Sequence, residues 1–414
     1  MIRFSLASNF VSRALIGAAI AATASLSMGC SDDGAKEDGD TEYVEGPLYL
    51  VSTSVLTNDS ATSYLTTVKS LDAGPKLDLK NAVEFGGGSR AYGQKGADVV
   101  YVTSSESPTL TEVTIKPSGM PLKGRVLNLT NYGITGTTGG NVHHFISATK
   151  AYFVSQETLE VVVWNPQAME VIKTIPLGLT PQANSAGIVY YPRPILVGDE
   201  LLVISSDYDD NDVAQPSVIT IVDTGTDTVV SSKQDPRCHS LLSSGVDANG
   251  DRYFATDGYS VAVHHMAPDV APAPCMLRIK AGEKFFDQTW SRSFADELGT
   301  DLWTGVTPGA DGTLFVQAIP GDTPSVEAAE DAYSITIATP WTWYSLSSPD
   351  AAPKALSSDF LTTPPLFPAI EVGDTSYVSL WDDTDTTLVD LSSSATPQKR
   401  LVVPGFVYNI VQVR

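Results

Sequence analysis

Short hydrophobic runs recur along the chain at a nearly constant spacing. Each run follows a turn with Gly or Asp and consists of aromatic or aliphatic residues that end in Val-Ser or a close relative. Seven copies can be aligned, and their central residues are Val51, Val102, Val154, Ile204, Ala255, Val316 and Val378. Successive centres lie between 50 and 62 residues apart. A period of this length is typical of proteins in which each repeat forms one supersecondary unit.

Each repeat holds several runs rich in β-branched and aromatic residues, bounded by Gly, Pro, Asp and Asn. In the third repeat these runs cover residues 143–146, 151–155, 159–164 and 171–175. Runs of this kind are typical of β-strands. Long helical periodicity is absent, and only residues 325–332 are expected to form a helical turn, inside a loop. The pattern predicts an all-β fold, a seven-bladed β-propeller with four-stranded antiparallel blades.

The two ends of the chain predict how the ring closes. An acidic segment precedes the first repeat and leaves no room for an innermost strand there. Residues 405–413 form one additional hydrophobic run after the seventh repeat. We therefore expect this C-terminal strand to supply the innermost strand of the first blade. Such closure removes exposed sheet edges, which are sites of unwanted strand pairing.

The first thirty residues have the layout of a secretory signal. Arg3 and Arg13 precede an uncharged stretch of small and apolar residues at 14–29. That stretch is short for a bilayer-spanning helix, which needs about 20 residues, so a signal peptide is predicted and a retained membrane anchor is the alternative.

Residues 26–30 read Leu-Ser-Met-Gly-Cys and resemble a bacterial lipobox. The resemblance implies cleavage before Cys30 and acylation of its thiol; ordinary signal cleavage beside an incidental cysteine is the alternative. Residues 31–45 contain seven acidic residues and one Lys, a composition that stays solvated and extended. The predicted organisation is a lipoprotein signal peptide at 1–29, a lipidated Cys and acidic tether at 30–45, and the propeller at 46–414. Ser31 favours the outer membrane, on its periplasmic or surface face.

Two hairpins carry a more specific resemblance. Residues 161–178 and 219–230 resemble YVTN-type propeller hairpins, in which an Asp-Thr-x-Thr-like turn joins two strands and Pro-x-Gly follows. As a whole, the chain also resembles MxcI-like propeller lipoproteins that accompany siderophore clusters. This second resemblance implies a part in iron–siderophore uptake beside an outer-membrane receptor.

Charge and cysteine content narrow the candidate partners. Lys and Arg total 25 against 48 Asp and Glu, for a formal net charge of −23. Such a chain repels phosphate backbones and anionic membrane surfaces, so nucleic acid is excluded as a partner and the membrane is reached only through the lipid. Export to an oxidising compartment predicts a disulfide between Cys238 and Cys275, with two separate buried thiols as the alternative. Their spacing matches no zinc or haem motif.

A set of basic and aromatic residues lies about ten to eighteen residues before the repeat centres: Arg90, His143, His144, Arg193, Arg237, His239 and Trp303. These side chains could converge at the channel mouth and hold an anionic or catechol-like ligand. The alternative is that they are separate caps and strand-end hydrogen bonders. Because neighbouring strand residues face opposite ways, neither His143-His144 nor His264-His265 is expected to chelate one metal as a pair.

Asp207, Asp209, Asp210 and Asp212 are candidate calcium ligands, because calcium takes several oxygens from flexible loops. A solvated acidic loop is the alternative. The sequence has no haem-attachment motif, nucleophile elbow, P-loop or dinucleotide fingerprint, so it assigns no catalytic residue. Two function classes remain: a propeller that binds a small ligand or a protein, and a propeller lyase or hydrolase with its site at the channel mouth.

Overall fold

The computed structural model describes residues 43–56, 61–94, 96–135, 143–180, 187–190, 193–309, 311–320, 323, 326, 329–338, 341–356, 369–373, 375–391 and 397–414. The predicted signal peptide, Cys30 and most of the predicted tether lie outside these residues.

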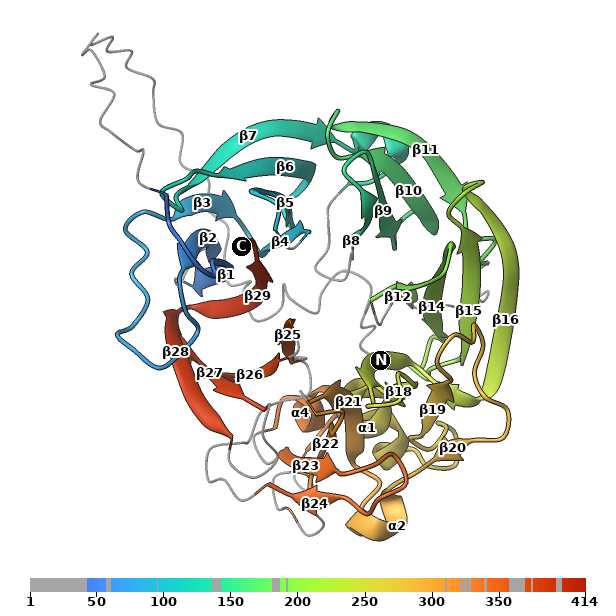
Figure 1. Cartoon of the computed structure of the whole chain (residues 1–414). Helices are drawn as coiled ribbons and strands as arrows, with labels where there is room; N and C mark the ends of the chain where they lie inside the picture. The colour runs from blue at the N-terminus through green and yellow to red at the C-terminus, as the bar shows by residue number, and fades with distance from the viewer. Residues whose placement is uncertain are drawn as a thin grey trace, which may run out of the picture.

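Seven antiparallel sheets form a ring around a central axis (Figure 1), as the repeat predicts. From the centre outward, blade 1 consists of β29 (Phe406–Gln412), β1 (Tyr49–Leu56), β2 (Ala61–Val68) and β3 (Val83–Gly86). Blade 2 consists of β4 (Ser89–Gly93), β5 (Val99–Ser104), β6 (Ser107–Ile115) and β7 (Pro121–Asn128). Blade 3 consists of β8 (His143–Ser147), β9 (Lys150–Ser155), β10 (Glu160–Asn165) and β11 (Glu170–Pro176).

Blade 4 has a divided inner strand, because β12 (Gly187–Tyr190) and β13 (Ile195–Val197) both pair with β14 (Glu200–Tyr208); β15 (Pro216–Asp223) and β16 (Thr228–His239) follow. Blade 5 consists of β17 (Leu241–Val246), β18 (Arg252–Thr256), β19 (Met276–Ile279) and β20 (Ser291–Arg292). Blade 6 consists of β21 (Trp303–Pro308), β22 (Leu314–Ala318), β23 (Thr342–Leu346) and β24 (Lys354–Ala355). Blade 7 consists of β25 (Ile370–Val372), β26 (Thr375–Trp381), β27 (Asp385–Asp390) and β28 (Gln398–Pro404).

The recurring hydrophobic run is the second strand of every blade. This strand has strand neighbours on both edges and another blade over each face, so both sets of alternating side chains are buried. In β9, for example, residues 151–155 are all buried, whereas the outer strand β11 of the same blade is largely exposed. Seven hydrophobic clusters hold the ring together, one between each pair of neighbouring blades.

The C-terminal strand closes the ring as predicted. β29 pairs antiparallel with β1, from Tyr49 opposite Gln412 to Ser54 opposite Phe406. Gly405 begins this strand with φ of +80°, and a Cβ atom there would lie 2.3 Å from the carbonyl oxygen of Ser54. Only glycine fits this approach, because a side chain would meet both a strained backbone and a fixed carbonyl group.

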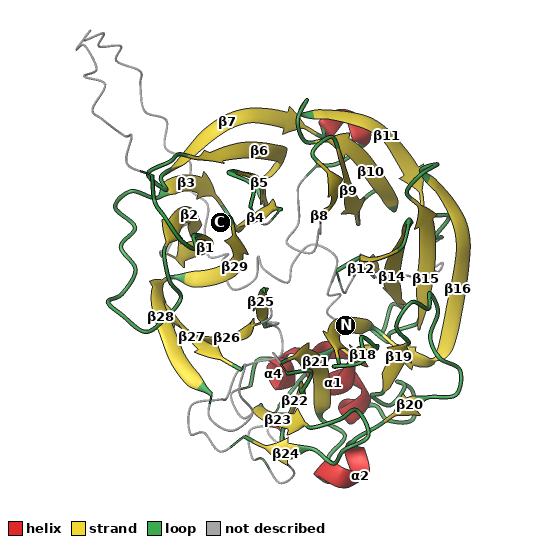
Figure 2. Cartoon of the chain, viewed as in Figure 1, coloured by secondary structure: helices red, strands yellow, loops and turns green. Residues whose placement is uncertain are grey.

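The helices that the structure describes are short: α1 (Gly258–Met266), α2 (Ala295–Leu298), α4 (Ala332–Thr336) and the 3₁₀ turn η2 (Thr130–Tyr132). α1 and α4 are neighbours beside the fifth and sixth blades (Figure 2) and share one hydrophobic cluster. Asp257 caps α1 by accepting hydrogen bonds from the backbone N–H groups of Tyr259 (2.8 Å) and Ser260 (3.1 Å). None of the helices seen in these residues is long and apolar enough to cross a membrane.

One local argument is wrong. His264 and His265 belong to helix α1, so the strand argument applied to that pair does not hold. A segment of nine residues is too short to show a clear helical period. The helical turn expected at 325–332 agrees with Val326, which is helical, and helix α4 begins at the last residue of that range, Ala332.

Gly405→Ala should lower the free energy of unfolding by at least about 2 kcal/mol, since strain at positive φ adds to the clash with Ser54. Gly282→Ala is the matched control, because Gly282 has φ of +78° and no atom within 4 Å of the added Cβ. Chemical denaturation measures both variants. Equal losses of unfolding free energy in the two variants would show that the approach of residue 405 to Ser54 does not require glycine there.

Candidate functional site

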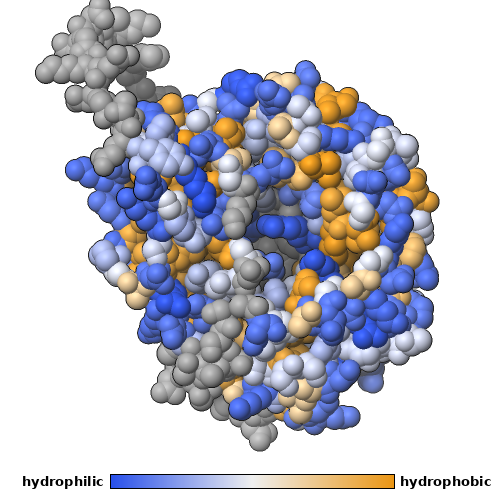
Figure 3. Space-filling model, in the orientation of Figure 1, coloured by the Kyte–Doolittle hydropathy of each residue, from blue (hydrophilic) through white to orange (hydrophobic). Residues whose placement is uncertain are grey.

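The innermost strands of the seven blades surround the axis of the ring (Figure 1). In the space-filling view the ring is hollowed at its centre, and hydrophilic residues lie on part of the visible wall of this hollow, which we name the channel (Figure 3). Side chains that project from these strands can therefore meet across the channel although they belong to different blades.

Four titratable side chains from four blades form what we name the central charged group: His144, Arg193, Arg252 and Glu371. His144 is on β8, and Arg193 lies between β12 and β13. Arg252 begins β18 opposite Val246 of the inner strand β17, and Glu371 is the middle residue of β25. All four are thus placed on or beside inner strands, in blades 3, 4, 5 and 7.

The charges of these four side chains influence one another. Arg193 contributes to lowering the pKa of His144, and both Arg193 and Arg252 oppose the rise in the pKa of Glu371. Arg193 and Glu371 belong to blades 4 and 7, which are as far apart as two blades can be in this ring. Their positions on or beside inner strands bring both residues near the axis, where charges of different blades can interact.

Confinement in the channel is the larger cause of each shift. Burial lowers the pKa of His144 and of Arg252 and raises the pKa of Glu371. Yet Glu371 and Arg193 are exposed and His144 and Arg252 are half-buried by surface area. The two observations agree if these groups border channel water while the ring encloses them on all sides. The lowered pKa keeps His144 neutral at pH 7. The group is nevertheless net positive whether or not Glu371 is protonated, because it contains two guanidinium groups and one carboxyl group.

Two other predicted residues, Arg90 and His143, are on inner strands but do not belong to the central charged group. The guanidinium carbon of Arg90 on β4 lies 5.6 Å from the ring centre of Tyr408 on β29, and its Nε has no hydrogen-bond partner in the described structure. His143 is 5% exposed and stacks on Phe153 with ring centres 4.8 Å apart. Burial lowers the pKa of His143 to about 3, so it is a neutral packing residue. Of the adjacent pair, only His144 contributes to the charged group, as strand alternation predicts.

Three other predicted residues have structural surroundings. Trp303 is fully buried and packs against Phe294 with ring centres 4.9 Å apart, so it lies in the hydrophobic core between blades 5 and 6 and not at the channel. His239 Nδ1 lies 2.6 Å from the carbonyl oxygen of Ala214. Arg237 pairs with Asp235 at 2.7 Å. The predicted set of basic and aromatic residues therefore contains a residue of the hydrophobic core and residues that bind other parts of the protein, as well as channel residues.

The carboxylates of the predicted calcium loop have protein partners. Asp209 Oδ1 accepts hydrogen bonds from the backbone N–H groups of Asn211 (2.8 Å) and Val213 (3.0 Å). Asp207 accepts from the N–H of Tyr208 at 2.8 Å, and Asp212 accepts from the hydroxyl of Tyr259 at 3.1 Å. Asp210 is exposed. In the part of the chain that the structure describes, no three His, Cys, Asp or Glu side chains are grouped to hold a metal ion. Calcium at this loop stays a prediction.

Cys238 and Cys275 are joined across two blades. Their sulfur atoms are 1.97 Å apart and their Cα atoms 5.7 Å apart. Cys238 is in the outer strand β16 of blade 4, and Cys275 directly precedes β19 of blade 5. The link therefore reinforces the interface beside the hydrophobic cluster that both residues contact.

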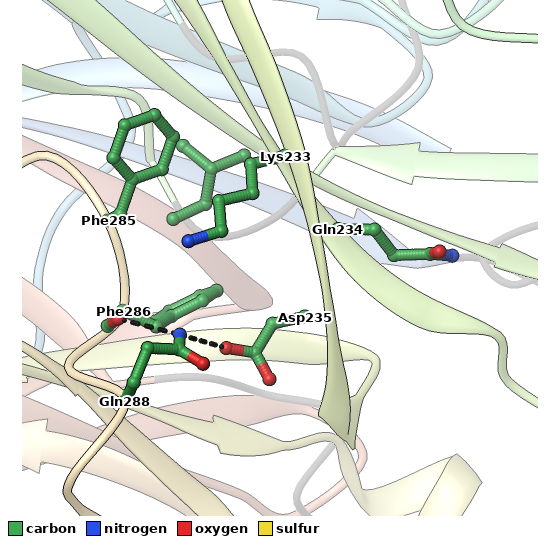
Figure 4. Close-up of a pocket in the computed structure, with 7 residues that line it drawn as sticks. Lys233, Gln234, Asp235, Phe285, Phe286 and Gln288 are labelled. Carbon is green, nitrogen blue, oxygen red and sulfur yellow. Dashed lines mark hydrogen bonds between the residues drawn. The ribbon is translucent and has the colours of Figure 1, made fainter.

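A pocket at the outer part of this interface is too small for a ligand site (Figure 4). It leaves almost no space for even a water-sized molecule, whereas typical small-molecule sites enclose roughly 300–1,000 Å³. Its polar atoms satisfy one another, since Gln288 Nε2 donates to Asp235 Oδ2 and to the carbonyl oxygen of Phe286, both at 3.0 Å. Lys233 lies over the ring of Phe285, at 5.4 Å from its centre. We assign this pocket a packing role.

Sequence reasoning missed two members of the central charged group. Arg252 directly follows the turn that joins β17 and β18, and Glu371 interrupts the short hydrophobic run Ile370–Val372. A charged residue beside the turn that joins the first and second strands of a repeat was the available signal. It does not reveal which blades would supply partners.

Comparisons with known proteins identify the fold and no family. No family model matches the chain, and no curated protein matches it. Among solved structures, a Bacteroides fragilis protein proposed to be a 6-phosphogluconolactonase aligns with a TM-score of 0.52 at 8% identity, over 92% of this chain and 100% of that chain. A Lactobacillus plantarum protein gives 0.49 at 13% identity, over 89% and 100%. AztD from Citrobacter koseri gives 0.43 at 10% identity, over 89% and 98%. At such a low identity, the likeness to the first of these structures supports the propeller fold alone, and no argument rests on the other two.

Replacing Cys238 and Cys275 by Ser should lower the free energy of unfolding by about 2–4 kcal/mol, because the 37-residue loop between them is no longer closed in the unfolded chain. Denaturant unfolding with and without a reducing agent measures the loss. Two freely alkylated thiols in the unreduced, unfolded wild-type protein would contradict the disulfide.

Arg193→Gln should raise the pKa of His144, because a nearby positive charge disfavours the imidazolium. The pKa should stay below the ordinary value of about 6.5, since burial persists. Titration of the five histidines by NMR, assigned with His144→Asn, measures the shift. Arg125→Gln is the control, because Arg125 pairs with Glu112 in the outer part of blade 2. An unchanged pKa in Arg193→Gln would mean that the two side chains do not meet.

Proposed function

We propose that this protein is a lipid-anchored envelope protein that binds a small anionic ligand in the channel of its propeller. The central charged group is the observation that carries the proposal. The lipid on Cys30 would hold the protein at the outer membrane, on its periplasmic or surface face, and the tether would separate it from the bilayer.

The arginines of the channel lack the partners that arginines have elsewhere in this protein. Among the described residues, no salt bridge involves Arg90, Arg193 or Arg252. On the outer parts of the blades, by contrast, Arg237, Arg278 and Arg400 each pair with a carboxylate. In a chain of net charge −23, two guanidinium groups beside the single carboxyl group of Glu371 leave a positive potential inside the channel. Planar guanidinium groups form strong paired hydrogen bonds to carboxylate or phosphate oxygens.

Ferric siderophores are the ligand class that we propose to test first. The support is the resemblance to MxcI-like lipoproteins, together with the negative charge that many ferric siderophore complexes carry. Binding beside an outer-membrane receptor would place the protein in iron–siderophore uptake. The negative outer surface does not oppose this, since the contact would be made inside the channel, where the positive group lies.

An enzyme, a propeller lyase or hydrolase, is the second candidate. The observation that favours it is the carboxyl group of Glu371. Burial raises its pKa, and the guanidinium groups of Arg193 and Arg252 oppose the rise without cancelling it. Such a carboxyl can act as a general acid or base on a bound anion. Turnover that is lost in Glu371→Gln while ligand binding persists would favour this candidate.

The test compares wild type, Arg193→Gln with Arg252→Gln, and the control Arg125→Gln in titrations with ferric catecholate, ferric citrate and the iron-free ligands. We expect binding by wild type and by the control, and at least a tenfold weaker affinity in the double variant, equivalent to about 1.4 kcal/mol. Equal affinity in all three proteins would move the site out of the channel. Absence of binding by every anion would overturn the proposal.

A further inference from the structure

A second group of side chains, at the opposite end of the channel wall, combines aromatic rings with an arginine. We name Trp381, Phe406 and Tyr408 the aromatic strip. Ring centres are 5.8 Å apart between Trp381 and Phe406 and 5.2 Å apart between Phe406 and Tyr408. Arg90 continues the strip, with its guanidinium carbon 5.6 Å from the centre of the Tyr408 ring. The strip thus runs from blade 7 over blade 1 to blade 2.

Backbone register separates this strip from the central charged group. Glu371 pairs with Ser376 near the beginning of β26, and Trp381 is the last residue of the same strand. At about 3.3 Å per residue, these two levels are roughly 16 Å apart along the strand. The Trp381 end of the strip therefore lies nearer the loops that join the second and third strands of the blades, and Arg90, which pairs with Thr103 on β5, lies between that end and the level of Glu371.

The strip differs from the hydrophobic core of the same strands. On β29, Val407 is 2% exposed and belongs to the cluster between blades 7 and 1. Phe406 and Tyr408, on either side of it, are half-buried. Tyr408 lies against Gly88, where an added Cβ atom would be 2.8 Å from the tyrosine hydroxyl. The three rings of the strip, two on β29 and one at the end of β26, are therefore all partly accessible to solvent.

Polar groups along the strip are incompletely satisfied. Trp381 Nε1 and Arg90 Nε are buried and lack a hydrogen-bond partner among the described residues, which is unfavourable for a buried polar group. Within the described part of the chain, no carboxylate forms a salt bridge with Arg90 either. A ring face beside an unpaired guanidinium matches a ligand that is both flat and anionic, since the rings take the flat surface and the guanidinium takes the oxygens.

We infer that the aromatic strip and Arg90 form a second subsite of the channel, which takes a planar aromatic carboxylate or phenolate. The inference rests on the proposed function, because it places this subsite in the same ligand channel. The aromatic group lies against Phe406 and Tyr408, and its anionic oxygens face Arg90. The central charged group is left for other anionic groups of the same ligand or for a second ligand.

The probes are benzoate and cyclohexanecarboxylate, which share charge and approximate size but differ in flatness and aromaticity. Isothermal titration of the purified protein should show benzoate binding at least about threefold more tightly, the preference expected from contact with aromatic rings. Phe406→Leu should abolish the preference while Phe406→Tyr retains it. Arg90→Gln should weaken both probes about tenfold. Arg193→Gln should leave the preference unchanged. Thermal unfolding of each variant checks that the ring remains folded.

The outcomes separate the two proposals. Equal affinity for the two probes, with loss in Arg193→Gln and not in Arg90→Gln, would overturn the second subsite and leave the proposed function intact. The same holds if ferric siderophores bind and neither probe does. A benzoate preference that survives Phe406→Leu in a folded protein would also overturn the inference. If neither the probes nor any siderophore binds, the proposed function fails first and this inference with it.

Discussion

The pairing of the last strand with the first is the constraint on which the remaining structure depends. β29 reaches blade 1 only because Gly405 lets the backbone pass against Ser54. Once that pairing forms, blades 7 and 1 are neighbours and the channel has a continuous wall. The same strand then brings Tyr408 beside Arg90, and closure sets Glu371 of blade 7 opposite Arg193 of blade 4. Both proposed ligand regions are consequences of the closed ring.

Stability and function are divided between different parts of each blade. The second and third strands fill the hydrophobic clusters between blades, and the outer strands carry ion pairs such as Arg237 with Asp235. The inner strands have one side on the core and one on the channel. His143 and His144 show the division within two residues: the first is stacked in the core, and the second couples to Arg193 in the channel.

The fold was predictable because its strongest constraint is local and repeated. A strand buried on both faces must be hydrophobic throughout, and that requirement recurs seven times. The closing strand could be predicted from simple counting of strands at the two ends. Helix α1 was missed because its buried face is made of small residues over nine positions. The lipid anchor and the siderophore relationship remain predictions, because they rest on residues or resemblances outside the described structure.

The site was predictable only in part, because its residues meet across the ring. His144 and Arg193 were identified by their position before a repeat centre, and the same criterion also selected Trp303, which is a core residue. An aromatic residue at a strand start can pack in the hydrophobic core or line the channel, so its position in the sequence does not distinguish the two. Arg252 and Glu371 were missed because no spacing within one repeat encodes a partner in blade 4 or 7. Only closure of the ring determines which charges face one another.

We propose that Arg193 and Arg252 form a solvent-facing positive centre inside the channel. Anomalous diffraction from crystals soaked in bromide tests this arrangement most directly. We expect a bromide peak inside the ring, between the two guanidinium groups and away from Glu371. Bromide confined to the outer surface, with the channel filled by apolar side chains, would contradict it.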